Sequence, residues 1–136
     1  KNWDFTYLGY DISQEMIAEA IKNYRHLSCC RFTSLDSDLP VMEYVVESGI
    51  FNVRFDESVQ GWGDYVLATL NKMNALSSKG FSFNMLTKYS DPERMRPDLY
   101  YADPCFYFDY CKTHFSRNVA LLHDYQLFDF TILVRK

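Results

Sequence analysis

Asp11 is the residue of this chain whose type and position have the clearest chemical use. It follows the apolar segment Tyr7–Tyr10 and precedes Ser13, a favourable helix N-cap. Ile17 and Ile21 then fall at helical spacing. A carboxylate at the carboxyl edge of a parallel sheet can accept hydrogen bonds from both hydroxyls of a ribose. The sequence therefore predicts a ribose-containing ligand at Asp11, with a structural role at the helix start as the alternative.

A second polar group follows the short strand predicted over residues 29–33. Asp36 and Ser37 stand in the loop behind this strand, and Asp38 comes directly after them. Asp36 is the better ligand candidate of the two acids because it comes sooner after the strand. A solvated acidic loop is the equal alternative.

The segment 47–52 lies at the end of a buried strand predicted over residues 43–51, which is rich in β-branched and aromatic residues. Gly49, next to Ser48, lets a backbone approach a ligand closely. Glu47 is unusual here because a buried, unpaired carboxylate is costly. We expect Glu47 to point to an edge, to meet a cation or to touch the ligand.

His123 is a candidate general base. It stands with Asp124 at the carboxyl end of a strand predicted over residues 118–123. An imidazole in this place can accept a proton from a reacting group. A histidine that only satisfies local hydrogen bonds is the alternative.

Composition narrows the function classes. The 136 residues are 48% hydrophobic and 18% aromatic, which predicts a packed globular domain. A net charge of −4 and a pI near 5.3 argue against a nucleic-acid partner, and no apolar run reaches the ~20 residues that span a bilayer. The four cysteines match no common zinc spacing, which favours reduced thiols in the cytoplasm and no metal.

The order of elements predicts an α/β fold. Helices are expected from Ser13, over 62–77 and from Asp103; strands are expected over 3–10, 29–33, 43–51, 81–86, 118–123 and 128–135. The last two strands are joined by only a few residues, too few for a crossover connection. These two strands are therefore expected to form an antiparallel hairpin.

This order, together with three motifs, resembles the class I S-adenosylmethionine-dependent methyltransferases. The motifs are Asp11-Ile12-Ser13 with a following helix that contains Glu-Met, the strand over 45–52, and the C-terminal hairpin. The resemblance implies a Rossmann-like three-layer sandwich whose mostly parallel sheet ends in an antiparallel hairpin. It also implies S-adenosylmethionine as the cofactor.

The resemblance assigns roles to particular residues. Asp11 would bind the ribose hydroxyls, and Ile12 would lie against the adenine ring. Asp36 would accept from the adenine amine, with the next backbone amide at a ring nitrogen, and the segment 47–52 would open near the methionine part. The cofactor-binding residues that the resemblance implies are Asp11, Ile12, Asp36, Ser37, Ser48 and Gly49.

The Gly-x-Gly loop that this family places after its first strand does not occur before Asp11. Gly61-Trp62-Gly63 matches the Gly-x-Gly pattern but follows a different strand. We therefore expect residues 1–136 to form a single methyltransferase-like domain that is N-terminally incomplete. The strands expected over 3–10 and 43–51 would then pair directly, bind another chain or mediate self-association.

The sequence thus predicts an enzyme that transfers a methyl group from S-adenosylmethionine to a small-molecule acceptor. A non-catalytic, truncated methyltransferase-like module is the first alternative, favoured by the missing glycine loop. A nicotinamide-dependent oxidoreductase is the second. It shares the ribose-binding acid, but its last two strands would run parallel.

Overall fold

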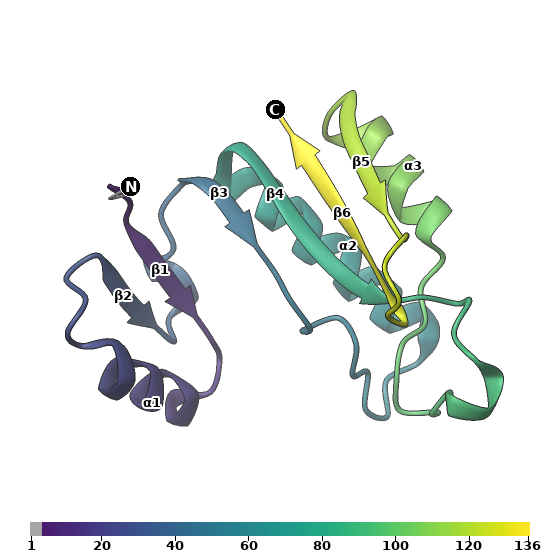
Figure 1. Ribbon diagram of the computed structural model, residues 1–136, viewed down its shortest axis with the longest axis horizontal. Helices are drawn as coiled ribbons and strands as arrows, with labels where there is room; N and C mark the ends of the chain where they lie inside the picture. The colour runs from purple at the N-terminus through teal and green to yellow at the C-terminus, as the bar shows by residue number, and fades with distance from the viewer. Residues whose placement is uncertain (1–3) are drawn as a thin grey trace. The chain divides into compact units, whose positions relative to one another are not determined.

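The computed structural model describes residues 4–136, and it has two compact units, of which the first ends at Pro40 and the second begins at Val41. Strands and helices alternate along most of the described chain, as predicted, and the fold class is α/β with mixed sheets. Figure 1 shows the elements of each unit. The predicted start of the first strand at Trp3 lies outside the described residues.

The first unit is built from β1 (Tyr7–Tyr10), α1 (Gln14–Tyr24), β2 (Cys30–Thr33) and the short 3-10 helix η1 (Asp36–Asp38). Strands β1 and β2 pair in parallel, with Tyr10 opposite Thr33. The helix begins as predicted, because the Ser13 hydroxyl accepts a hydrogen bond from the backbone N–H of Met16 at 3.3 Å.

Packing in the first unit centres on Phe32. Its ring lies 6.0 Å from the rings of both Tyr7 and Tyr24, so strand and helix side chains meet on one aromatic residue. Gly9 makes room for this ring, since a Cβ at that position would lie 2.6 Å from Phe32. Glycine at the end of β1 is therefore a packing requirement as well as part of a sequence motif.

The second unit holds a four-stranded sheet in the order β3-β4-β6-β5. Its strands are β3 (Met42–Val46), β4 (Ser77–Leu86), β5 (Asn118–Leu122) and β6 (Asp129–Arg135). Strand β4 is parallel to β3, whereas β6 is antiparallel to both β4 and β5. The predicted C-terminal hairpin is thereby confirmed. Strands β5 and β6 are antiparallel, whereas the oxidoreductase alternative required them to be parallel.

The core of the second unit lies between this sheet and two helices, α2 (Val59–Leu76) and α3 (Pro104–His114). Alternate residues of β4 and β6 face it, and both helices contribute fully buried side chains. These core side chains are Val66, Leu70, Met73, Phe81, Phe83, Met85, Tyr107, Cys111, Phe130, Ile132 and Val134. In the described part of the chain, no helix combines the length and apolar character needed to cross a membrane.

Several predicted boundaries are wrong, three of them in the second unit by three residues or more. Strand β3 ends at Val46, so residues 47–51 form a loop and are not part of the strand. Helix α2 begins at Val59, earlier than predicted, because the Ser58 hydroxyl caps it by accepting from the Gly61 N–H at 2.9 Å. Strand β4 begins directly after α2 at Ser77, so Gly80 lies within a strand and not in a turn.

Replacing Gly80 with alanine is expected to lower the free energy of unfolding by about 3 kcal/mol. The backbone of Gly80 has φ +156°, and an added Cβ would lie 2.3 Å from the Val134 carbonyl oxygen of the neighbouring strand. Gly49→Ala is the matched control. Its φ is +91° with open space around the Cβ, so backbone strain alone should lower stability by about 1 kcal/mol.

Urea unfolding followed by circular dichroism measures both variants. If both variants lose the same free energy of unfolding, the close approach of β4 and β6 does not explain the need for glycine at position 80.

Candidate functional site

The carboxyl edge of the first unit brings together two of the predicted ligand positions. Because β1 and β2 are parallel, Asp11 and the loop that begins at residue 34 leave the sheet at the same edge. The backbone N–H of Asp11 donates to the carbonyl of Thr33 at 3.3 Å, which ties the two strand ends together.

The Asp11 carboxylate has a local partner on one oxygen. Its Oδ1 accepts a hydrogen bond from the Ser13 N–H at 2.8 Å, which helps to turn the chain into α1. Among the described residues no hydrogen bond to Oδ2 is found. The predicted ligand role and the structural alternative are thus compatible, since each can use one oxygen. Ile12, between these residues, is 82% exposed and does not pack in the core.

The acidic loop after β2 forms η1. Asp36 and Ser37 are both exposed there. Asp38 serves the turn itself, because its two carboxylate oxygens accept from the hydroxyls of Ser37 and Thr33, each at 3.3 Å. Asp38 therefore has a structural role in this turn, and the preference for Asp36 as a ligand residue stays a prediction.

Ser48 and Gly49 belong to the second unit, where both are exposed in the loop after β3. The backbone N–H of Gly49 donates to the Asn84 side-chain oxygen at 3.0 Å. A φ of +91° explains why glycine occupies this position, since other residues rarely adopt it. The structure thus places the predicted cofactor residues as two groups, one in each unit.

His123 comes directly after β5, at the same sheet edge as Ser48 and Gly49. Strands β4 and β6 lie between them in the sheet. The imidazole is exposed, and its ring centre is 6.1 Å from that of Tyr89 and 6.2 Å from that of Phe130. It therefore has aromatic neighbours as well as access to solvent.

A polar network that the sequence indicated only through Glu47 lies at this edge. Glu47 is 7% exposed, and its Oε1 accepts from the Ile50 N–H at 2.6 Å. Asn84, which holds Gly49, also donates through Nδ2 to Asp129 Oδ2 at 3.0 Å. In the described part of the chain, Glu47 Oε2 and Asp129 Oδ1 are both buried without a hydrogen-bond partner.

Burial changes the protonation of Glu47. Desolvation raises the pKa of this carboxyl from 4.5 to about 7, and the hydrogen bond from Ile50 opposes the change only in part. Three outcomes were expected for Glu47. Its burial rules out an exposed edge position. Among the described residues, no lysine or arginine forms an ion pair with it. Glu47 is therefore a proton-binding group near neutral pH.

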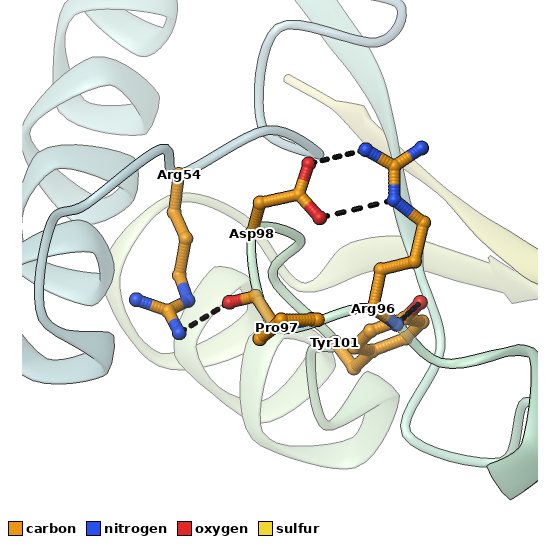
Figure 2. A network of polar contacts seen from close by, with 5 residues as sticks. All are labelled: Arg54, Arg96, Pro97, Asp98 and Tyr101. Carbon is orange, nitrogen blue, oxygen red and sulfur yellow. Dashed lines mark hydrogen bonds and ion pairs between the residues drawn. The ribbon is translucent and has the colours of Figure 1, made fainter.

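A cleft of about 350 Å³ opens beside the same edge. Its walls include Arg54 from the loop after β3, and Arg96 and Tyr101 from the segment after η2 (Pro92–Arg94). Figure 2 shows the Arg54 guanidinium reaching the Pro97 carbonyl while Arg96 pairs with Asp98. We call this feature the Arg54–Arg96 cleft.

Sequence reasoning did not find this cleft because its walls come from segments about forty residues apart. Nothing in the pattern around Arg54 marks it as part of a site. Among residues 4–136, no group of three histidine, cysteine or acidic side chains is arranged so that it could hold a metal ion.

Comparisons with known proteins agree with the predicted activity. No family model matches the chain. A protein of Mycobacterium tuberculosis named "Putative methyltransferase Rv1506c" is 49% identical over 130 residues, which make up 96% of this chain and 78% of that protein. A chain of the solved structure described as "Structure of the Pnkp1/Rnl/Hen1 RNA repair complex" matches with a TM-score of 0.65 at 11% identity.

The structural match covers 99% of this chain and 32% of the other, so this chain spans about a third of the length of its structural neighbour. At this identity the match concerns the fold. It corrects one prediction all the same. The argument from net charge against a nucleic-acid partner is wrong, because the same fold occurs in a component of an RNA repair complex.

Glu47→Gln is expected to stabilise the protein at pH 8 by about 3 kcal/mol and to have little effect at pH 4. A folded-state pKa near 7, above the unfolded 4.5, means that the folded state binds the proton more tightly. Stability of the parent protein should therefore fall as pH rises from about 4.5 to 7 and stay level above. The amide still accepts from Ile50 but carries no charge.

Urea unfolding at the two pH values measures this difference. Glu93→Gln, at an exposed glutamate of η2, is the control and should change stability by less than about 0.5 kcal/mol at both. Equal effects of Glu47→Gln at pH 4 and pH 8 would contradict the assigned pKa.

Proposed function

Because this chain belongs to the same family as the mycobacterial methyltransferase homologue, we propose that it is a class I, Rossmann-like methyltransferase that uses S-adenosylmethionine. The identity of 49% over almost the whole chain is the observation that carries this proposal. The β3-β4-β6-β5 sheet with its antiparallel hairpin supports the fold. A cytoplasmic location is part of the proposal, and four free cysteines support it.

The residues of the first unit fit the nucleoside part of such a cofactor. Asp11 keeps one carboxylate oxygen for the turn and has the other available for ribose hydroxyls. Ile12 exposes an apolar side chain next to it, suited to an adenine ring. Asp36 and Ser37 leave the sheet at the same edge, where they would bind the polar edge of adenine.

In the second unit, Ser48 and Gly49 are the residues proposed for the methionine part of the cofactor. The open space above the Gly49 Cα position would allow close approach of a ligand to the backbone. When bound, the cofactor supplies an electrophilic methyl group on a sulfonium. The protein's own contribution is then to orient the acceptor and to exclude water. His123 is the proposed proton acceptor where the acceptor must lose a proton.

For the acceptor, we propose a small molecule. The Arg54–Arg96 cleft, at about 350 Å³, falls in the range of small-molecule sites, roughly 300–1,000 Å³. RNA is a second candidate, and the fold shared with a chain of an RNA repair complex favours it. A non-catalytic module of the same fold is the remaining alternative, and cofactor binding with methyl transfer separates it from an enzyme.

Substitutions at Asp11 test the cofactor site. Asp11→Asn keeps the acceptor for the Ser13 N–H but removes the charge, and Asp11→Ala removes both. A charge-assisted hydrogen bond contributes about 1.5–3 kcal/mol, so Asp11→Ala should weaken binding of S-adenosylhomocysteine roughly ten- to hundredfold. Asp11→Asn should lose most of that affinity with almost no loss of stability. Isothermal titration calorimetry measures the affinity and thermal unfolding the stability.

Ser13→Ala is the matched control, because it removes the helix cap without touching the proposed ligand oxygen. It should lower stability by about 1 kcal/mol and leave affinity unchanged. If Asp11→Ala behaves like Ser13→Ala, with lower stability and unchanged affinity, Asp11 only starts the helix.

A further inference from the structure

We infer that the Arg54–Arg96 cleft is an acceptor-binding site that selects a ligand carrying an anionic group, a carboxylate or a phosphate, on an aromatic or apolar body. This inference deepens the proposed methyltransferase function and rests on it for the word acceptor. The binding of the anion itself does not depend on the cofactor.

Charge is distributed unevenly at this cleft. The chain as a whole carries a net charge of −4. Of the described residues that line the cleft, two are arginines and none is acidic. A cavity lined by two arginine residues attracts a ligand of negative charge.

Arg54 is the first cation of the cleft, and two hydrogen bonds hold its guanidinium in place. Its guanidinium donates to the backbone carbonyls of Glu57 and Pro97, which are uncharged partners. In the described part of the chain no carboxylate lies within ion-pair distance of Arg54, although Arg54 contributes to lowering the pKa of the Asp98 carboxyl. Its buried Nε has no hydrogen-bond partner. The two Nη atoms carry four N–H groups and donate to two carbonyls, so two N–H donors remain for a ligand.

Arg96 is the second cation of the cleft, and it is paired with a carboxylate. Its Nε and Nη2 donate to the two oxygens of Asp98 at 3.0 and 2.5 Å, and this contact keeps the pKa of the Asp98 carboxyl below its ordinary value. Asp98 does not itself line the cleft, and Figure 2 shows its carboxylate turned toward Arg96. The cluster of Arg54, Arg96 and Asp98 therefore has a net charge of +1.

The remaining wall defines the body of the ligand. Met95, Leu99, Tyr100 and Tyr101 contribute apolar and aromatic surface. The Tyr101 hydroxyl accepts from the Arg96 backbone N–H at 3.0 Å, which fixes the phenol group against the Arg96 backbone. An aromatic or apolar group could pack on these side chains while its anion meets the arginines.

The cleft is also connected to the residues proposed for the methionine part of the cofactor. Asn52, three residues after Gly49, accepts from the Leu86 N–H at 3.1 Å, and its carbonyl accepts from Tyr100 at 2.9 Å. One residue thus joins the end of β4 to both cleft-forming segments. The cleft and the proposed methionine-binding residues Ser48 and Gly49 therefore share one loop.

Phenyl phosphate is the probe, with benzamide as an uncharged aromatic control and inorganic phosphate as an anion without a ring. Backbone and arginine side-chain signals are followed by ¹⁵N NMR during titration. Phenyl phosphate should shift the signals of Arg54, Arg96 and Tyr101 and bind more tightly than either control. Equal binding of benzamide and phenyl phosphate would overturn the inference.

Two substitutions break the same ion pair with opposite effects on charge. Arg96→Gln lowers the charge of the cluster to zero, and Asp98→Asn raises it to +2. For such partly exposed charges, Arg96→Gln should weaken phenyl phosphate binding about three- to tenfold, and Asp98→Asn should tighten it about two- to fivefold. If both variants weaken binding equally, the pair has only a structural role and the inference is wrong.

A competition experiment identifies the source of the anion. A short single-stranded RNA with a terminal phosphate is added to the phenyl phosphate complex, with the unphosphorylated RNA as its control. Displacement by the phosphorylated RNA alone supports a nucleic-acid end as ligand, and displacement by neither supports a small molecule. If the protein binds phenyl phosphate but does not bind S-adenosylhomocysteine, the proposed function is refuted and the anion site is retained.

Discussion

The pairing of β4 with β3 on one side and β6 on the other determines where every polar loop of the second unit begins. Leu86, the last residue of β4, lies opposite Asp129 of β6, and β3 runs parallel to β4. The loops after β3, β4 and β5 consequently leave at one edge. Gly80 allows this pairing, since any side chain there would strike the backbone of β6. The candidate residues of this unit share an edge for that reason.

The same pairing forces polar groups into a partly dry environment. Glu47 follows β3 directly, and its backbone N–H still donates to Ser82 of β4 at 2.9 Å, so its side chain starts within the packed edge. The bond from Ile50 supplies one donor for a carboxylate that can accept about four. A raised pKa is the physical result, because protonation removes the charge that burial disfavours. Groups of this kind concentrate at functional sites, although structural networks produce them too.

Sequence patterns predicted the features that depend on local chemistry. The spacing of the last two strands required a hairpin, and Ser13 and Asp103 both cap the helices that they were expected to start. Patterns failed where tertiary contacts decide. Helix α2 passes into β4 without a turn, so the strand predicted over 81–86 begins too late. Arg54 and Arg96 line one cleft from distant segments, which periodicity cannot indicate.

The error about nucleic acid shows why net charge is a poor guide to a site. A value of −4 sums groups across the whole molecule, whereas salt at physiological strength screens exposed charges beyond about 8 Å. A ligand in the cleft therefore responds mainly to nearby groups, here Arg54, Arg96 and Asp98. Their sum is positive although the chain is acidic. The charge that governs recognition is set by the fold, which brings two arginines to one cavity and pairs the neighbouring carboxylate of Asp98 with Arg96.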